Sequence, residues 1–133
     1  MTVIDASAVV NLLLRPRENH ASRRLLDDDL RAPSILIPEV TNAIKKHVSF
    51  RTLSGQAARK KIALLSMLPV DLVHTQRLSL HIWDLARTFS TYDACYVSRA
   101  MHLDDTLITS DRKLANEARR HVTVQFLDPS TLD

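Results

Sequence analysis

Four acidic residues, spread along most of the chain, are the groups in this sequence that are best placed to do chemistry. Asp5 ends an apolar segment that is typical of a buried strand, Glu39 follows a second apolar segment, and Asp93 lies near the start of a helical pattern. Asp111 comes directly after a further strand-like segment, residues 106–110. Because the carboxyl ends of parallel strands meet at one edge of a sheet, we expect these side chains to gather there.

Such a group of carboxylates points to a divalent cation. Carboxylates that are forced together raise one another's pKa, and a hard cation relieves the repulsion. Mg²⁺ and Mn²⁺ prefer carboxylate and water oxygens to imidazole or thiolate. Because such an ion orients a phosphate and lowers the pKa of bound water, the sequence predicts metal-dependent hydrolysis of a phosphodiester. For any one acid taken alone, a simple role at a helix start stays open.

The composition excludes several other kinds of site. Gly55 is the only glycine, whereas a P-loop or a dinucleotide-binding fingerprint needs several. Cys95 is the only cysteine, which excludes an intrachain disulfide and a multi-cysteine zinc site and favours a reducing cytoplasm. The six histidines have no zinc-protease spacing. Metal-free cleavage by a pair of histidines remains an alternative.

Length and charge favour one folded domain with a polyanionic partner. The 133 residues, 45% of them hydrophobic and 25% charged, suit a single domain over residues 1–133. The net charge of +3 is compatible with nucleic acid. The chain starts with an apolar run, but Asp5 interrupts it and no basic segment precedes it, so we expect a strand and a helix rather than a signal peptide. No apolar stretch has the length of a membrane span, so we expect a cytoplasmic protein without membrane contact.

Strand-like and helix-like patterns alternate along the chain. Strands are predicted at residues 2–5, 33–37, 70–73, 106–110 and 122–126. Helices are predicted at residues 6–14, 18–30, 39–50, 54–68, 76–89, 92–103 and 112–120. Because helical crossovers join parallel strands, this order predicts an α/β sandwich with a mostly parallel sheet between layers of helices.

Four blocks of sequence resemble a known family. "VIDASAVV", "PEVTNAI", "TYDACYVSRA" and "LITSDRKLA" are similar, in order and spacing, to the acidic blocks of PIN domains, and most of all to those of VapC toxins. The resemblance covers essentially the whole chain, and the four blocks are specific only together. It implies a three-layer α/β/α sandwich with a parallel five-stranded sheet of order 3-2-1-4-5. It also implies Mg²⁺- or Mn²⁺-dependent endoribonuclease activity and a cognate antitoxin that blocks the site.

The resemblance assigns roles to individual residues. The family's acidic positions, which are catalytic and bind the metal, are matched by Asp5, Glu39, Asp93 and Asp111. Ser7 matches a residue that commonly supports the metal site, and Asn42 matches one that is expected to orient the glutamate. Ser110 stands where the family often has Ser, Thr or Ala before the last acid. The family's frequent glycine in the turn before residue 106 is replaced here by "MHLDD", a departure that concerns turn geometry.

Other residues leave alternatives open. Three cationic residues are candidates for binding the RNA backbone or are ordinary surface residues: Arg15, Arg112 and Lys113. Trp83 and Phe89 favour the core or a partner contact over base stacking. Glu117 is expected to pair with Lys113 or His121 on its helix rather than to support the site.

The helices between residues 39 and 68 carry more apolar residues than one core-facing stripe requires. The apolar positions are Val40, Ile44, Val48, Phe50, Ile62, Leu64, Leu65 and Leu68. Excess apolar surface marks an interaction site, so we expect an antitoxin helix or a second copy of the chain, in a homodimer, to cover it. A core that is packed on two sides is the alternative.

These observations lead to two hypotheses. The first is an endoribonuclease in which a metal-activated water attacks phosphorus, leaving 5′-phosphate and 3′-hydroxyl ends. The second is a PIN-like module that binds RNA or a protein partner without cutting.

Overall fold

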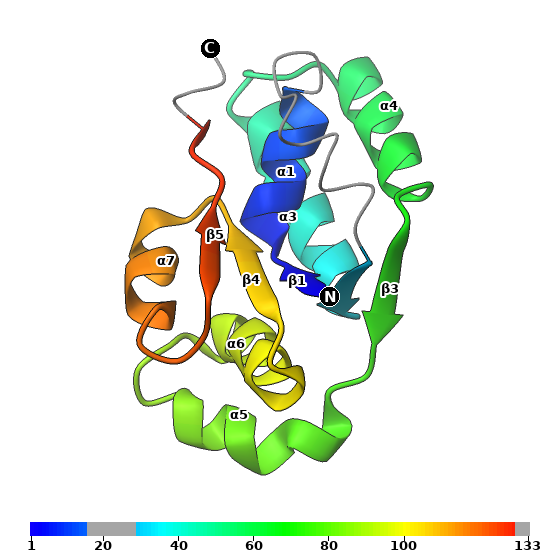
Figure 1. The fold of residues 1–133 in the computed structure, drawn as a ribbon. Helices are drawn as coiled ribbons and strands as arrows, with labels where there is room; N and C mark the ends of the chain where they lie inside the picture. The colour runs from blue at the N-terminus through cyan, green and yellow to red at the C-terminus, as the bar shows by residue number, and fades with distance from the viewer. Residues whose placement is uncertain (16–28, 130–133) are drawn as a thin grey trace.

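A parallel sheet forms the centre of the fold (Figure 1). The computed structural model describes residues 1–15 and 29–129. The strands are Thr2–Ile4 (β1), Leu30–Pro33 (β2), Val70–Val73 (β3), Thr106–Thr109 (β4) and Val124–Phe126 (β5). All neighbouring strands are parallel and their order is β3-β2-β1-β4-β5, which confirms the predicted sheet. The strand order reverses at β1, which lies between β2 and β4.

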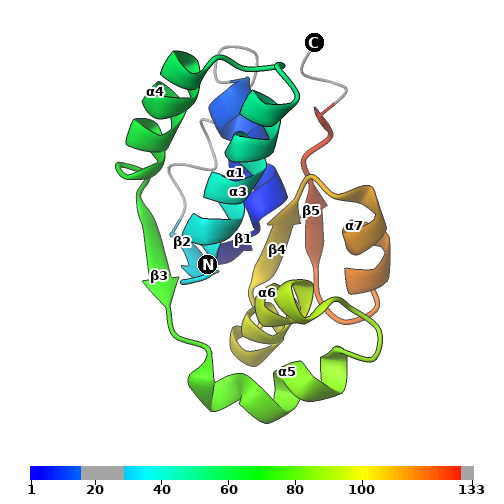
Figure 2. The ribbon, with the colours of Figure 1, turned by 180° about the vertical axis from the view of Figure 1, so that it is seen from behind.

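Helices cover both faces of this sheet (Figures 1 and 2). One layer contains Ala6–Leu14 (α1), Leu36–Ser49 (α3) and Gly55–Leu65 (α4). The other contains Thr91–Leu103 (α6) and Arg112–Ala118 (α7), with the 3₁₀ turn Gln76–Leu78 (η1) and Ser79–Leu85 (α5) leading into it. Within the described ranges, no helix has the length and apolar character needed to cross a membrane.

Short polar side chains begin four of the helices. Asp5 and Asp111 accept hydrogen bonds from the backbone N–H of Ala8 and Leu114, and so cap α1 and α7. Ser54 caps α4, and Ser90 accepts from the N–H of Asp93 at the start of α6. The caps fix where each helix starts relative to the preceding strand, and therefore where the acids lie.

Aliphatic side chains from β1 and β4 form the centre of the core. Val3, Ile4, Leu107 and Ile108 are fully buried, because helices cover both faces of these two strands. Ile4 is paired with Ile108. This register places Asp5 beside Thr109, one residue further along both strands.

One predicted element is wrong, and others differ from the prediction in their bounds. The predicted strand at residues 33–37 is replaced by β2 at Leu30–Pro33 and by α3, which begins at Leu36. Pro38 is the third residue of α3, where a missing N–H costs no helical hydrogen bond. The predicted helix at residues 18–30 falls largely outside the described residues, and its last residue, Leu30, belongs to β2. The predicted helix at residues 76–89 is shorter, because it ends at Leu85.

Candidate active site

Asp5 is the most tightly held of the four acids. It follows β1 and is 4% exposed. Its Oδ1 accepts from the Ser7 hydroxyl at 2.7 Å and from the Ala8 N–H at 3.0 Å, and its Oδ2 accepts from the Thr109 hydroxyl. Burial raises the pKa of Asp5 to about 6 although these three hydrogen bonds oppose the rise. A carboxylate this deep, with raised pKa, suits a cation that compensates its charge.

Thr109 links the two acids that follow neighbouring strands. Its side chain is fully buried. The hydroxyl donates to Asp5 and accepts from the backbone N–H of Asp111 at 3.0 Å. The sequence analysis missed this residue. The one feature of the sequence that could have identified Thr109 is its position, two residues before Asp111 and at the end of a strand predicted to lie beside Asp5.

Ser7 and Ser110 belong to the same hydrogen-bond network. The Ser110 N–H donates to the Ser7 hydroxyl at 2.9 Å, and the Ser110 hydroxyl accepts from Asn11 at 3.0 Å. Ser7 also lies 3.1 Å from the Thr109 hydroxyl. These contacts tie the start of α1 to the end of β4, so they fix the floor of the acidic site.

Helix starts bring in Glu39 and Asp93. Each lies in the first turn of its helix, α3 and α6 respectively. Burial raises the pKa of both, and the charge of Asp93 contributes to the rise at Glu39, as that of Asp111 does at Asp93. The charge of Asp93 also raises the pKa of Asp5. The four predicted acids therefore form one electrostatically coupled group, in which the charge of Asp93 acts on both Asp5 and Glu39.

The donor set fits Mg²⁺ or Mn²⁺ in chemistry, but its side chains stand apart. In the described part of the chain, no three His, Cys, Asp or Glu side chains are placed to share one ion. Asp5 is fixed by its donors, whereas Glu39 and Asp93 are half-buried and Asp111 is exposed. The other three carboxylates would have to move toward Asp5 to complete a site of carboxylate oxygens, the ligands that such ions prefer.

Tyr96 orients Glu39. Its hydroxyl donates to Glu39 Oε1 at 2.7 Å, and the side chain is almost fully buried one turn beyond Asp93 on α6. Burial, together with this hydrogen bond, raises the pKa of Tyr96, so the phenol stays a donor. The sequence analysis assigned the role to Asn42, which is exposed on α3. In this structure the hydroxyl of Tyr96 makes this contact with Glu39, and the role of Asn42 stays a prediction.

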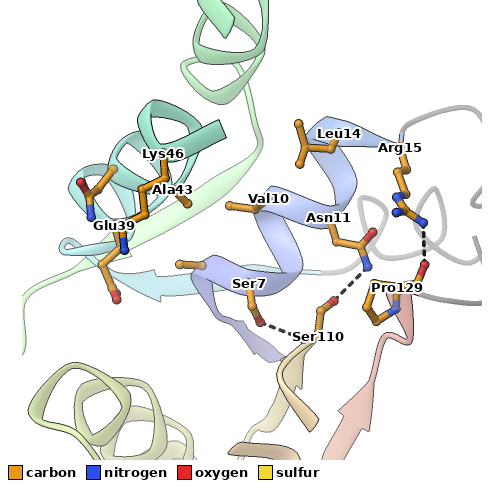
Figure 3. Close-up of a pocket in the computed structure, with 12 residues that line it drawn as sticks. Ser7, Val10, Asn11, Leu14, Arg15, Glu39, Ala43, Lys46, Ser110 and Pro129 are labelled. Atoms are coloured by element: carbon orange, nitrogen blue, oxygen red, sulfur yellow. Dashed lines mark hydrogen bonds between the residues drawn. The ribbon is translucent and has the colours of Figure 1, made fainter. Parts of the chain in front are cut away.

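A groove of about 540 Å³ leads away from the acids between α1 and α3 (Figure 3). Glu39, Asn42 and Lys46 line it from one face of α3. Ser7, Val10, Asn11, Leu14 and Arg15 line it from α1, and Ser110 and Pro129 close one side. The groove thus has carboxylate and hydroxyl groups at one end, an apolar floor, and cationic side chains further along.

A second hollow of about 450 Å³ lies on the other side of the acids. Asp93, Asp111, Lys113 and Glu117 contribute its polar lining. Glu117 pairs with Arg120 at 3.6 Å, not with the predicted Lys113 or His121. Lys113, one of the predicted cations, is exposed and lines this hollow.

The other two predicted cations, Arg112 and Arg15, differ in where they lie. Arg112 lies over the ring of Phe126 at 4.7 Å and pairs with Asp128 at 3.5 Å, so it is directed toward β5. Arg15 donates to the carbonyl of Pro129 at 2.8 Å at the rim of the groove. Of the three candidates, Lys113 and Arg15 therefore line a hollow beside the acids, and Arg112 does not.

The apolar residues of α3 and α4 are mostly core. Val40, Ile44 and Leu65 are buried, which supports the two-sided core for these positions. Phe50 and Leu64 remain exposed, at 77% and 46%. Elsewhere Phe89 is buried as expected, whereas Trp83 is 72% exposed on α5 and is not part of the core.

Known proteins resemble this chain in sequence and in fold. The PIN domain family model matches residues 2–119. Ribonuclease VapC1 of Mycobacterium tuberculosis is 34% identical over 116 residues, which cover 85% of this chain and 87% of that protein. A VapC ribonuclease of Mycobacterium bovis is 27% identical over 126 residues, covering 93% of this chain and 98% of that one.

A solved structure agrees with the sheet topology. A crystal structure of a Pyrobaculum aerophilum protein superimposes with a TM-score of 0.65 and 22% identity, covering 98% of this chain and 92% of the other. This likeness concerns the fold. Taken with the family match and the two relatives, it leads to one conclusion: the chain belongs to the PIN-domain family, and within it to the VapC type.

Proposed function

We propose that the protein is a Mg²⁺- or Mn²⁺-dependent endoribonuclease and the toxin of a type II, VapBC-like toxin–antitoxin pair. The observation that carries the proposal is the coupled group of Asp5, Glu39, Asp93 and Asp111, whose oxygens suit a hard cation. Support also comes from the relatives, which are named ribonucleases. RNA as substrate, the cognate antitoxin and a cytoplasmic location belong to the same proposal.

Each side chain has a distinct part in this proposal. The four acids would hold one or two divalent ions, which when bound supply a Lewis acid for the phosphate and lower the pKa of a water. Asp5 is the rigid member, because Ser7, Thr109 and the Ala8 N–H hold both of its oxygens. The ammonium of Lys113 lies in the hollow beside Asp93 and Asp111, where it can neutralise a substrate phosphate.

The proposal is tested by the products and by one substitution. We expect 5′-phosphate and 3′-hydroxyl ends, cleavage that EDTA stops and Mn²⁺ restores, and loss of at least about 100-fold in kcat/KM for Asp93→Asn. Asp84→Asn, at an exposed aspartate of α5, is the matched control and should cut normally. Cyclic phosphate ends insensitive to EDTA would indicate the histidine mechanism. RNA binding without any cleavage by the wild-type protein would indicate the non-cutting module.

Partners are part of the proposal. Phe50, Leu64 and Met67 leave apolar surface exposed around α3 and α4, which favours a covering antitoxin helix or a second copy in a homodimer. Co-expression with the adjacent small open reading frame should yield a complex that no longer cuts RNA. The isolated protein should elute as a dimer in size-exclusion chromatography, and a monomer with normal solubility would refute the homodimer.

A further inference from the structure

A third hollow, of about 670 Å³, lies on the far half of α6 from the acids. Its walls come from the segment after β3, with His74, Gln76 and Arg77, and from the last turns of α6, with Arg99 and His102. Leu78, which is buried, completes it. All five polar lining residues carry hydrogen-bond donors, two are permanently cationic, and no carboxylate lines the hollow.

Arg99 has donor capacity that the described part of the protein leaves unused. Its Nε is buried and has no hydrogen-bond partner among residues 1–15 and 29–129. In the same ranges, no ion pair is formed by Arg77 or Arg99. A buried donor without an acceptor is unfavourable, and a guanidinium that meets no carboxylate is free to bind an anion. Its planar fork matches two oxygens of a phosphate.

The third hollow and Asp93 lie on different sides of α6, because about 3.6 residues per turn place Arg99 and His102 well away from the side that carries Asp93. Asp93 is in the first turn, and Arg99 and His102 follow at about 9 Å and about 14 Å along the helix axis, given the rise of an α-helix. Cys95, one turn before Arg99, is on the same side of the helix. Burial raises the pKa of the Cys95 thiol and the charge of Glu39 adds to the rise, while Thr75 hydrogen-bonds to it. Cys95 therefore lies between the acidic site and the segment that forms the hollow.

We propose that the third hollow binds a phosphate group of the RNA chain, away from the bond that is cut. This inference rests on the proposed function, since it takes the substrate to be RNA. The volume is much larger than one phosphate ion needs, and a strand that passes round α6 would reach both places. Contacts of this kind hold the strand in register and carry no sequence information.

Two RNA lengths separate this role from catalysis. A trinucleotide is too short to span from the acids to the third hollow, whereas a long single-stranded RNA reaches both. We expect Arg77→Gln to lower kcat/KM about 10-fold on the long RNA and less than twofold on the trinucleotide. Arg59→Gln, which removes the same charge from exposed α4, is the matched control and should leave both unchanged. Equal effects of Arg77→Gln on both substrates, or none on either, would overturn the inference.

Binding measured in EDTA gives a second readout that needs no cleavage. The slope of log Kd against log salt for the long RNA should be smaller in Arg77→Gln, by the amount that corresponds to about one lost phosphate contact. Arg99→Lys keeps the charge and removes the fork, so it should weaken binding with little change in the slope. If the wild type cuts neither substrate, the proposed function fails, while these slopes still test the hollow.

Free phosphate is the other source of the same chemistry. Inorganic phosphate titrated by NMR should perturb Arg99 and His102 only weakly and should compete poorly with the long RNA. Tight phosphate binding that Arg77→Gln abolishes, together with an unchanged salt slope for RNA, would show a site for a free anion and would refute the RNA contact.

Discussion

Asp5 and Asp111 have the same local setting and very different surroundings. Each directly follows a strand, and each caps the helix that comes next. Asp5 is 4% exposed and accepts three hydrogen bonds, whereas Asp111 is exposed and accepts one from Leu114. The difference follows from packing around the central strand β1, and it separates a rigid carboxylate from one that can move.

The largest expected effect is a loss of cleavage activity that is the same for substitution of either acid. Asp5→Asn and Asp111→Asn should each lower kcat/KM by about 1,000-fold or more, because each removes a charged oxygen donor from the same group. Single-turnover cleavage at saturating Mn²⁺ is the measurement. Asp128→Asn, at an acid directed toward Arg112, serves as control. If Asp111→Asn kept its activity while Asp5→Asn lost it, Asp111 would not be an essential metal ligand.

The second prediction concerns the pH dependence of stability, to which Asp5 should contribute and Asp111 should not. Burial raises the pKa of Asp5 from 3.8 to about 6, so between these values the folded protein binds more protons than the unfolded chain. The contribution of Asp5 to the free energy of unfolding should therefore be largest below about pH 4. It should fall by about 3 kcal/mol as the pH rises to 6. The raised pKa values of Glu39 and Asp93 act in the same direction.

Urea unfolding in EDTA, across this pH range, measures the effect. Asp5→Asn should flatten the profile, whereas Asp111→Asn should keep it. Mn²⁺ should raise Tm more at pH 7 than at pH 5, since protons compete with the ion for Asp5. A wild-type profile identical to that of Asp5→Asn would contradict the assignment of this pKa.

Sequence reasoning predicted most of the sheet and placed the acids at its edge. It succeeded for β1 and β4 because their apolar runs are short, buried and followed by Asp. It failed at residues 33–37 because Leu36 is the buried first residue of a helix, and a short apolar run does not distinguish a helix start from a strand. Arg31, inside β2, also interrupts the apolar pattern of the true strand.

The hydrogen-bond partners of the acids were beyond the reach of the sequence pattern. Thr109 meets Asp5 across 104 positions, and Tyr96 meets Glu39 across 57. Both contacts depend on the register of β1 with β4 and on how α6 packs against the sheet. Any buried hydroxyl near these elements would look equivalent in the sequence, so three-dimensional packing decides which one acts.

The third prediction compares the two partner hydroxyls. Thr109→Val removes the donor to Asp5 and the acceptor for the Asp111 N–H, so it should weaken Mn²⁺ binding and lower kcat/KM by about 10- to 100-fold. Tyr96→Phe removes a single donor, to the half-buried Glu39, and should fall at the lower end of that range. Thr109→Ser keeps the hydroxyl and should restore most activity. A larger loss of activity for Tyr96→Phe than for Thr109→Val would contradict the expectation that the contact to Asp5 matters more than the contact to Glu39.

The smallest effect is expected at Asn42. It tests the same contrast, between side chains fixed by hydrogen bonds and side chains that are free to move. Because Tyr96 donates to Glu39 and Asn42 lies exposed on α3, Asn42→Ala should change kcat/KM less than twofold at saturating Mn²⁺. Exposed substitutions away from buried contacts also change stability little, so unfolding should stay within about 0.5 kcal/mol of wild type. A loss matching that of Tyr96→Phe would mean that Glu39 turns toward Asn42 when the metal binds, and that the mobile acids exchange partners during assembly of the site.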